Sequence, residues 1–262
     1  MKITSRKNQL VVRSRGLLRE KKIRDREGLF AVEGVKLCLE ALSAGIAAQW
    51  ALVSERASEK FVEEIAEIEQ SCTVTAVSDD VYDYLSEQKS PQGIFLAGQI
   101  LDKSVNLDRI LSSDKILLLD CLQDSGNLGT VLRTAEALGI GGALLSGDCA
   151  DIWSPKTLRA SMGSVFRLPI CVMNTASAVK AAKERGFTVY AAMLDKTAQS
   201  LGSFTFPKKS AALIGNEGHG VSEEAADLCQ KLYIPIQGAE SLNAAAAAAI
   251  ICWQMMEANS NE

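Results

Sequence analysis

Three loop-like stretches rich in glycine and asparagine lie in the second half of the chain. They are residues 127–133, 215–220 and 234–243, and each follows a short apolar run and leads towards a helix-like segment. Glycine allows the backbone to turn tightly and to approach a ligand closely, while asparagine, arginine, glutamate and serine supply polar groups beside it. The three stretches together predict a binding site built from loops.

The second half of the chain predicts a mainly parallel sheet covered by helices. Ile116–Leu119 is a continuous apolar run of the kind found in buried parallel strands, and a polar loop and a helical pattern follow it. Further strands are expected at 142–145, 167–172, 187–191, 211–214 and 232–234, and helices at 127–138, 176–185 and over the alanine run 244–249. Such strand–loop–helix units place functional groups beyond the carboxyl ends of the strands.

The first half predicts a smaller α/β unit. Gly28 ends a basic helical segment, after which strands are expected at 29–32, 50–53, 72–77 and 93–97, and helices at 35–43 and 59–70. The polar stretch 102–114 contains no convincing regular element, so we place a domain boundary near residue 105. A chain of 262 residues, 47% of them hydrophobic, is long enough for two domains, at 1–105 and 106–262.

Basic residues are concentrated at the amino end. Residues 1–27 carry ten lysines or arginines against three acidic residues, a net charge of +7, which leaves −11 for the rest of a chain whose formal charge is −4. A clustered basic face can neutralise phosphates and release counterions, which is the usual source of nucleic-acid affinity. The alternative is a solvated helix face, the ordinary fate of lysine and arginine.

Several functional classes lack their signatures. The chain contains neither a Gly-x-Gly-x-x-Gly fingerprint nor a P-loop, which disfavours dinucleotide oxidoreductases and P-loop NTPases. His219 is the only histidine and there is no Gly-x-Ser-x-Gly elbow, so hydrolase chemistry would need an unusual base. Glu217 and His219 lack the further ligands that zinc requires, and we expect no metal.

Compartment and redox state follow from what the sequence lacks. Seven scattered cysteines include no Cys-x-x-Cys pair, so neither a zinc site nor a disulfide framework is indicated. The first 27 residues carry no secretory signature, and no run of about 18 uninterrupted apolar residues occurs. We therefore expect a cytoplasmic protein that does not enter the membrane.

The three stretches resemble the motifs of a known family. In the family's order, they are similar to motifs 1, 2 and 3 of the SpoU/TrmH RNA ribose 2'-O-methyltransferases, of the SPOUT superfamily: Asn127-x-Gly129-x-x-x-Arg133, Gly215-Asn-Glu217-x-x-Gly220, and Ile234-Pro-x-x-Gly238 followed by Ser241-Leu-Asn243. Residues 159–169 also resemble the family, and the likeness covers about residues 115–257. The amino-terminal part more weakly resembles the L30e-like substrate-binding domain that often precedes this fold.

The resemblance implies S-adenosyl-L-methionine as cofactor and methylation of an RNA ribose 2'-hydroxyl. It also implies an α/β fold in which a deep trefoil knot holds the cofactor. Carried over residue by residue, the cofactor-binding positions are Ile214, Gly215, Asn216, Gly220, Ile234, Gly238 and Leu242. Apolar side chains and free backbone groups at these loops suit a flat, neutral adenine.

The resemblance assigns the central catalytic role to Arg133, with Asn127, Glu217, Ser241 and Asn243 in support. A protonated guanidinium has no acceptor for a proton, so Arg133 is a poor general base and is better suited to fixing the target phosphate and ribose. Each residue has an alternative role. Arg133 could form a surface ion pair, Glu217 could be a carboxylate near a helix, and Ser241 could cap the alanine-rich helix with Asn243 in its first turn.

In relatives the last helix packs across a two-fold axis, so the resemblance implies a homodimer. Ile250, Ile251, Trp253 and Met256 could anchor it, or could instead be buried within one chain. RNA is the expected partner, and large-subunit (23S-type) rRNA is the expected substrate. A tRNA methyltransferase, a noncatalytic RNA-binding protein that keeps the methyltransferase shell, and an enzyme acting on a small molecule are the alternatives.

Overall fold

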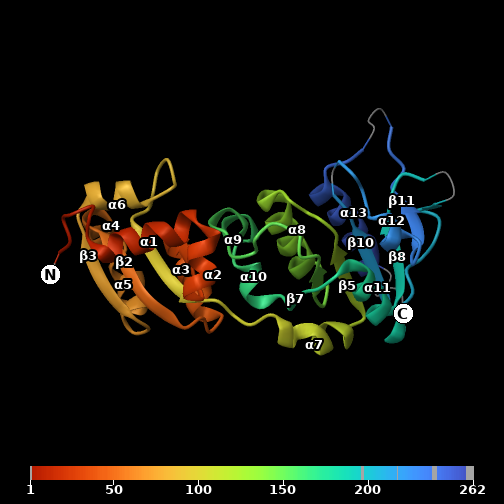
Figure 1. The fold of residues 1–262 in the computed structure, drawn as a ribbon, viewed down its shortest axis with the longest axis horizontal. Helices are drawn as coiled ribbons and strands as arrows, with labels where there is room; N and C mark the ends of the chain where they lie inside the picture. Colours follow the sequence, from red (N-terminus) through yellow and green to blue (C-terminus); the bar gives the residue numbers. More distant parts are fainter. Residues whose placement is uncertain (1, 196–197, 217, 238–240, 258–262) are drawn as a thin grey trace. The chain divides into compact units, whose positions relative to one another are not determined.

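The computed structural model describes residues 2–195, 198–216, 218–237 and 241–257 (Figure 1). The chain divides into two compact units, one formed by residues 1–101 and 153–166 and the other by residues 102–152 and 167–262. The assignment of 1–105 and 106–262 to two functional domains stays a prediction. Among the described residues, no helix has the length and apolar character needed to cross a lipid bilayer.

The first unit is built on a four-stranded sheet of order β1-β4-β2-β3, in which β4 runs antiparallel to both its neighbours and β2 and β3 are parallel. Leu17 and Leu18 pack with Leu52, Tyr82 and Phe95 in the core of this unit. The elements are α1 (Gln9–Arg19), α2 (Lys21–Glu27), β1 (Leu29–Glu33), α3 (Val35–Ser43), β2 (Ala48–Ser54), α4 (Glu55–Lys60), α5 (Val62–Glu69), β3 (Thr73–Val77), α6 (Asp79–Leu85), β4 (Ile94–Gln99) and, from the later segment, α9 (Pro155–Ser161).

Residues 153–166 join the first unit although they are distant from it in sequence. The ring of Trp153 stacks on that of Phe30 with 4.8 Å between centroids, and the ring of Phe166 lies 5.5 Å from that of Phe30. All three rings are nearly inaccessible to solvent. Aromatic burial therefore attaches this segment to strand β1.

The second unit contains the predicted parallel sheet, and the expected α/β class is confirmed. Seven strands lie in the order β7-β6-β5-β10-β8-β11-β9, and every neighbouring pair is parallel. The elements are η1 (Ser104–Asn106), α7 (Leu107–Leu111), β5 (Lys115–Leu119), α8 (Ser125–Ala137), β6 (Ala143–Leu145), β7 (Ile170–Val172), α11 (Thr175–Glu184), β8 (Thr188–Ala192), β9 (Gln199–Ser200), β10 (Ser210–Ile214), α12 (Glu223–Ala226), β11 (Gln230–Tyr233) and α13 (Ala244–Glu257). Residues 164–166 of the short helix α10 (Ser164–Arg167) belong to the first unit, and Arg167 belongs to the second.

Helices cover this sheet. Ile116 and Leu118 of β5 share a core cluster with Val179 of α11. Side chains alternate between the faces of a strand, so Leu117 and Leu119 point to the opposite face. Helix α13 packs against both α8 and strand β10. This packing brings the helix that follows the third motif against the helix that carries the first.

Some expectations for individual elements were wrong. The stretch 102–114 contains η1 and α7, because Leu107, Ile110 and Leu111 recur at helical spacing and pack on the core although polar residues surround them. The helix expected at 59–70 is two helices separated at Phe61, and Ser54 caps the first by accepting from the Ala57 N–H. The strand expected from residue 167 begins at Ile170, because Arg167 ends α10.

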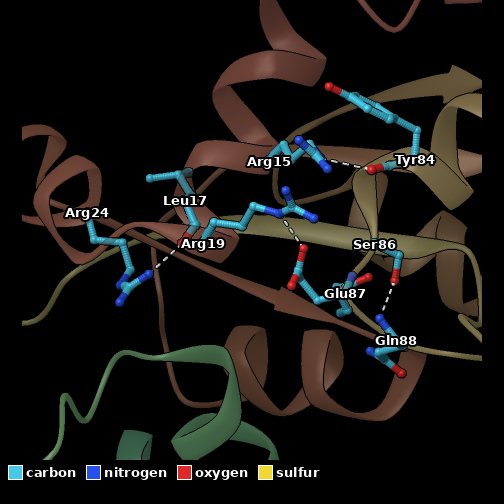
Figure 2. Close-up of polar contacts among 9 residues, drawn as sticks. Arg15, Leu17, Arg19, Arg24, Tyr84, Ser86, Glu87 and Gln88 are labelled. Atoms are coloured by element: carbon cyan, nitrogen blue, oxygen red, sulfur yellow. Dashed lines mark hydrogen bonds and ion pairs between the residues drawn. The ribbon is translucent and has the colours of Figure 1, made fainter.

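Most basic residues of the amino-terminal segment contact other residues of the first unit, and Figure 2 shows the contacts of Arg15, Arg19 and Arg24. Six of the ten pair with carboxylates: Lys2 with Glu55, Arg6 with Asp80, Arg13 and Arg26 with Glu27, Arg19 with Glu87, and Lys21 with Asp25. Arg15 donates to the Tyr84 carbonyl at 3.0 Å, and the buried Arg24 donates to the Leu17 carbonyl at 2.8 Å. Lys7 and Lys22 are exposed and pair with no carboxylate among the described residues. The segment is thus partly structural, and exposed ion pairs of this kind contribute little to stability.

Candidate active site

A cavity of about 520 Å³ lies where the parallel strands β8, β10 and β11 end. Their carboxyl ends meet at one edge because the strands run in the same direction and are neighbours in the sheet. The residues that line the cavity come from the loops that follow these strands and from the start of α13. Its volume is within the roughly 300–1,000 Å³ range of small-molecule and cofactor sites.

Six of the seven predicted cofactor positions line this cavity: Ile214, Gly215, Asn216, Gly220, Ile234 and Leu242. The seventh, Gly238, lies outside the described residues. Sequence reasoning missed residues 192–194 at the end of β8, together with Ala244 and Ala247, which also line it. Residues 192–194 could have been found by applying the strand-end rule to the strand expected at 187–191.

The loop after β10 is tightly folded. Asn216 and Gly220 exchange two backbone hydrogen bonds, each 2.9 Å long, and Gly220 has a φ of +71°. A Cβ on Gly215 would lie 2.2 Å from the carbonyl carbon of Gly220, so only glycine fits at this position. The Asn216 Oδ1 accepts from the backbone N–H groups of Gly218 and His219 at 2.8 and 3.2 Å. Hydrogen bonds within the loop therefore fix Asn216 and Gly220 relative to each other.

The first and third motifs meet through two asparagines. The Asn243 Nδ2 donates to the Asn127 Oδ1 at 3.0 Å. Asn127 lies in the first turn of α8, whose cap is Asp124, and Asn243 immediately precedes α13. The packing of α13 against α8 thus joins residues that are 116 positions apart in sequence.

Asn243, and not Ser241, caps the alanine-rich helix. The Asn243 Oδ1 accepts from the backbone N–H groups of Ala245 and Ala246 at 2.9 and 3.3 Å. The alternative in which Ser241 is the cap was wrong, because the helix begins at Ala244 and Ser241 lies on the wall of the cavity. The oxygen of the Asn243 side chain therefore accepts from N–H groups that lack a partner within α13, and its nitrogen contacts Asn127.

Arg133 lies on α8, on the exposed side of the helix. Its guanidinium forms no hydrogen bond or ion pair with any residue that the structure describes, so the surface ion pair considered as an alternative is not formed there. Glu217, the remaining predicted catalytic residue, lies outside the described residues. The structure thus brings Asn127 and Asn243 into contact, places Ser241 at the cavity and leaves Arg133 accessible.

A parallel α/β sheet with glycine-rich loops around one cavity at its carboxyl edge defines a protein that binds a nucleotide-like cofactor. The SpoU rRNA Methylase family model matches residues 114–253, and the MRM3-like substrate binding domain model matches residues 10–96. The chain belongs to the SpoU rRNA methylase family. The resemblance seen in the three motifs is confirmed.

Relatives match the chain over nearly its full length. It is 34% identical over 257 residues to the 23S rRNA (guanosine(2553)-2'-O)-methyltransferase RlmP of Bacillus subtilis, a match that covers 97% of this chain and 98% of that protein. The AdoMet-bound rRNA methyltransferase from Sinorhizobium meliloti superposes with a TM-score of 0.87 at 29% identity, over 98% of this chain and 97% of the other. The SpoU methyltransferase AviRb from Streptomyces viridochromogenes in complex with AdoMet gives a TM-score of 0.85 at 28% identity, over 97% and 99%.

The cap assignment predicts how substitutions at Asn243 affect stability. Asn243→Ala should lower the free energy of unfolding by about 1 kcal/mol, because two backbone N–H groups at the start of α13 lose their acceptor. Asn243→Asp should retain the cap, since a carboxylate also accepts there. Urea denaturation would measure both, with Ser241→Ala as the matched control that should leave stability unchanged. A larger loss for Ser241→Ala than for Asn243→Ala would contradict the assignment.

Proposed function

We propose that this protein transfers a methyl group from S-adenosyl-L-methionine to a ribose 2'-hydroxyl of large-subunit rRNA. The observation that carries the proposal is the cavity of about 520 Å³ lined by loops of the second and third family motifs, in a chain that belongs to the SpoU rRNA methylase family. The rRNA substrate is supported by relatives such as the Bacillus subtilis enzyme, which matches both units and not only the second.

The residues present fit the cofactor. Ile214, Ile234 and Leu242 give the cavity apolar walls suited to adenine, and Gly215 lets the backbone come close where a side chain would collide. Backbone groups of the loops after β10 and β11 would supply the polar contacts. When bound, the cofactor supplies a methyl group activated by its positively charged sulfur. The deep trefoil knot that the resemblance implies stays a prediction, supported by the position of β10 and β11 on either side of β8.

Arg133 is the residue proposed to hold the reacting ribose. A guanidinium binds phosphate through several N–H donors in one plane, and that of Arg133 is exposed and has no competing carboxylate among the described residues. Because arginine keeps its proton, its contribution is to fix the target nucleotide for attack on the methyl group, and a neighbouring phosphate can take the hydroxyl proton. Asn127 and Asn243, joined at 3.0 Å, would position the motif loops around the reacting atoms.

The test of this function is transfer of labelled methyl from S-adenosyl-L-methionine to unmodified total RNA separated into rRNA and tRNA. Arg133→Ala should lower transfer to rRNA by at least about 100-fold, the size of effect seen when a residue that stabilises or positions the transition state is removed. Cofactor affinity should change little, because Arg133 is not among the residues that line the cavity.

Arg133→Lys is the matched variant for this experiment. It keeps the charge but loses the planar fork, so its rate should be intermediate. Near-normal turnover of Arg133→Ala would exclude the assigned role. Label found only in tRNA would show that tRNA, and not rRNA, is the substrate. If neither methyl transfer nor cofactor binding were detected, a noncatalytic RNA-binding protein would be favoured.

The first unit is proposed to bind the RNA. Its residues 10–96 match a substrate binding domain, and ten basic residues lie at its amino end. Lys7 and Lys22 are the clearest candidates for phosphate contacts, since both are exposed and unpaired with carboxylates among the described residues. The exposed ion pairs of the other cations are weak enough to exchange a carboxylate for a phosphate.

Combined replacement of Lys7→Gln and Lys22→Gln should weaken binding to rRNA fragments and flatten its dependence on salt. Each lost phosphate contact should lower the slope of log K against log salt by roughly 0.7 to 0.9. Lys180→Gln with Lys208→Gln, two exposed lysines of the second unit, provides the matched change in net charge. Equal slopes for both double variants would exclude a specific role for Lys7 and Lys22. Filter binding at several salt concentrations would provide these slopes.

A homodimer through α13 is also proposed. Ile250 and Trp253 are three residues apart on one face of this helix and are 41% and 52% exposed, whereas Ile251 is buried within the chain. Exposed large apolar side chains on one helix face suit an interface between two copies. The cytoplasmic location expected from the sequence stays a prediction.

Trp253→Glu should convert the dimer into a monomer, because a carboxylate at the centre of an apolar interface loses its hydration without a partner. Sedimentation velocity at micromolar concentration would measure the change. Val62→Glu, at an exposed apolar position of the first unit, is the control that should remain dimeric. A monomeric wild-type protein would exclude the dimer.

A further inference from the structure

Asp120, which follows strand β5, holds a buried carboxylate between two other segments of the second unit. It is 4% exposed. Its Oδ1 accepts from the Thr175 hydroxyl at 2.6 Å, and its Oδ2 accepts from the Ser222 N–H at 3.0 Å and from the Ser222 hydroxyl at 2.8 Å. Three donors thus converge on a single carboxylate, and charged acceptors form the stronger hydrogen bonds.

The two residues that donate to Asp120 belong to different segments. Thr175 is the first residue of α11, which covers the sheet. Ser222 ends the loop that begins at Gly215 and precedes α12, and its hydroxyl makes no capping bond to that helix. The Ser222 hydroxyl therefore bonds Asp120 and not the helix. Of the two donor residues, Ser222 alone belongs to the loop that lines the cavity.

The next residue holds the beginning of the same loop. The Asn216 Nδ2 donates to the Cys121 carbonyl at 2.9 Å, and Cys121 adopts a φ of +54°, an unfavourable conformation for a residue with a side chain. Asp120 and Cys121 thus hold the loop at Ser222 and at Asn216, on both sides of Gly220. This arrangement holds the backbone of Gly215 and Gly220 at the cavity wall.

We propose that Asp120 is a positioning residue for the cofactor. Through Ser222 it holds the loop after β10 in the shape that binds S-adenosyl-L-methionine, so less conformational freedom is lost on binding. The inference rests on the proposed function for the identity of the ligand. It adds a residue outside the three motifs, which acts through a loop that contains two of the predicted cofactor positions, Gly215 and Gly220.

Two substitutions, each of which removes one hydroxyl group that donates to Asp120, separate a positioning role from a structural one. Ser222→Ala and Thr175→Val each remove one hydroxyl donor from Asp120, but only the first acts on the loop. Titration calorimetry of the full chain with S-adenosyl-L-methionine should show Kd raised roughly tenfold in Ser222→Ala and by less than about twofold in Thr175→Val. The KM for the cofactor should follow Kd, while kcat on rRNA changes less.

Hydrogen exchange in the ligand-free protein gives an independent reading. Backbone amides of the peptide 214–222 should exchange faster in Ser222→Ala than in the wild type or in Thr175→Val, because the loop loses one of its two hydrogen bonds to Asp120. Thermal denaturation of both variants identifies any general loss of stability, and the two milder substitutions avoid the buried vacancy that Asp120→Ala would create.

The outcomes distinguish this inference from the proposed function. If both substitutions changed Kd equally, or neither changed it, the positioning role would be overturned. The proposed function would still stand, provided that the wild-type protein binds S-adenosyl-L-methionine. A wild-type protein that does not bind S-adenosyl-L-methionine would overturn both. Unchanged exchange of the loop in Ser222→Ala would overturn the inference that Asp120 holds the loop through the Ser222 hydroxyl.

Discussion

Parallel pairing of β5, β10, β8 and β11 is the constraint on which the rest of the site depends. Because these strands run in one direction, their carboxyl ends lie at one edge, and the loops that follow them meet there although they are separated by up to about a hundred residues in sequence. The apolar strands hold this edge fixed, since Ile116, Ala211 and Leu213 are fully buried. The glycine-rich loops can then have irregular backbone without losing their positions.

Hydrogen bonds from side chains hold together the loops that the sheet brings to one edge. Asn243 caps α13 with its oxygen and contacts Asn127 with its nitrogen, so helix formation and the meeting of two motifs use one residue. Asp120 joins the end of β5 to Ser222, and Asn216 joins the same loop to the Cys121 carbonyl. The contacts of Asp120 and Asn216 join the ends of the adjacent strands β5 and β10, where unpaired backbone and side-chain groups need partners. Stability and site geometry therefore share the same bonds.

The basic amino-terminal segment also has two roles. Eight of its ten cations pair with carboxylates of the first unit or donate to its backbone, and Val11 and Leu17 on α1 belong to the core. Removing residues 1–27 would therefore take away part of that core as well as charge. Substitution of individual exposed lysines separates RNA affinity from folding, whereas truncation would not.

Prediction from sequence succeeded where the signal was local. The apolar run of β5 and the glycines of the loop after β10 indicated a buried strand and a close turn, and both are present. It failed at residues 102–114, where the apolar positions of α7 were diluted by polar neighbours, and at the cap of α13, which depends on where the helix starts. Ala192, Met193 and Leu194 were missed at the cavity because no motif marks them.

The sequence by itself determined the α/β class, the order of the three motifs and the family to which they belong, because periodicity and local residue patterns encode these properties. Only the tertiary structure decided that Asn127 contacts Asn243, that Asp120 accepts hydrogen bonds from Thr175 and Ser222, and that residues 153–166 pack on β1. Each of these contacts joins residues more than fifty positions apart. Such a contact depends on strand order and helix packing, which arise from burial of the whole core and not from any short stretch of the chain.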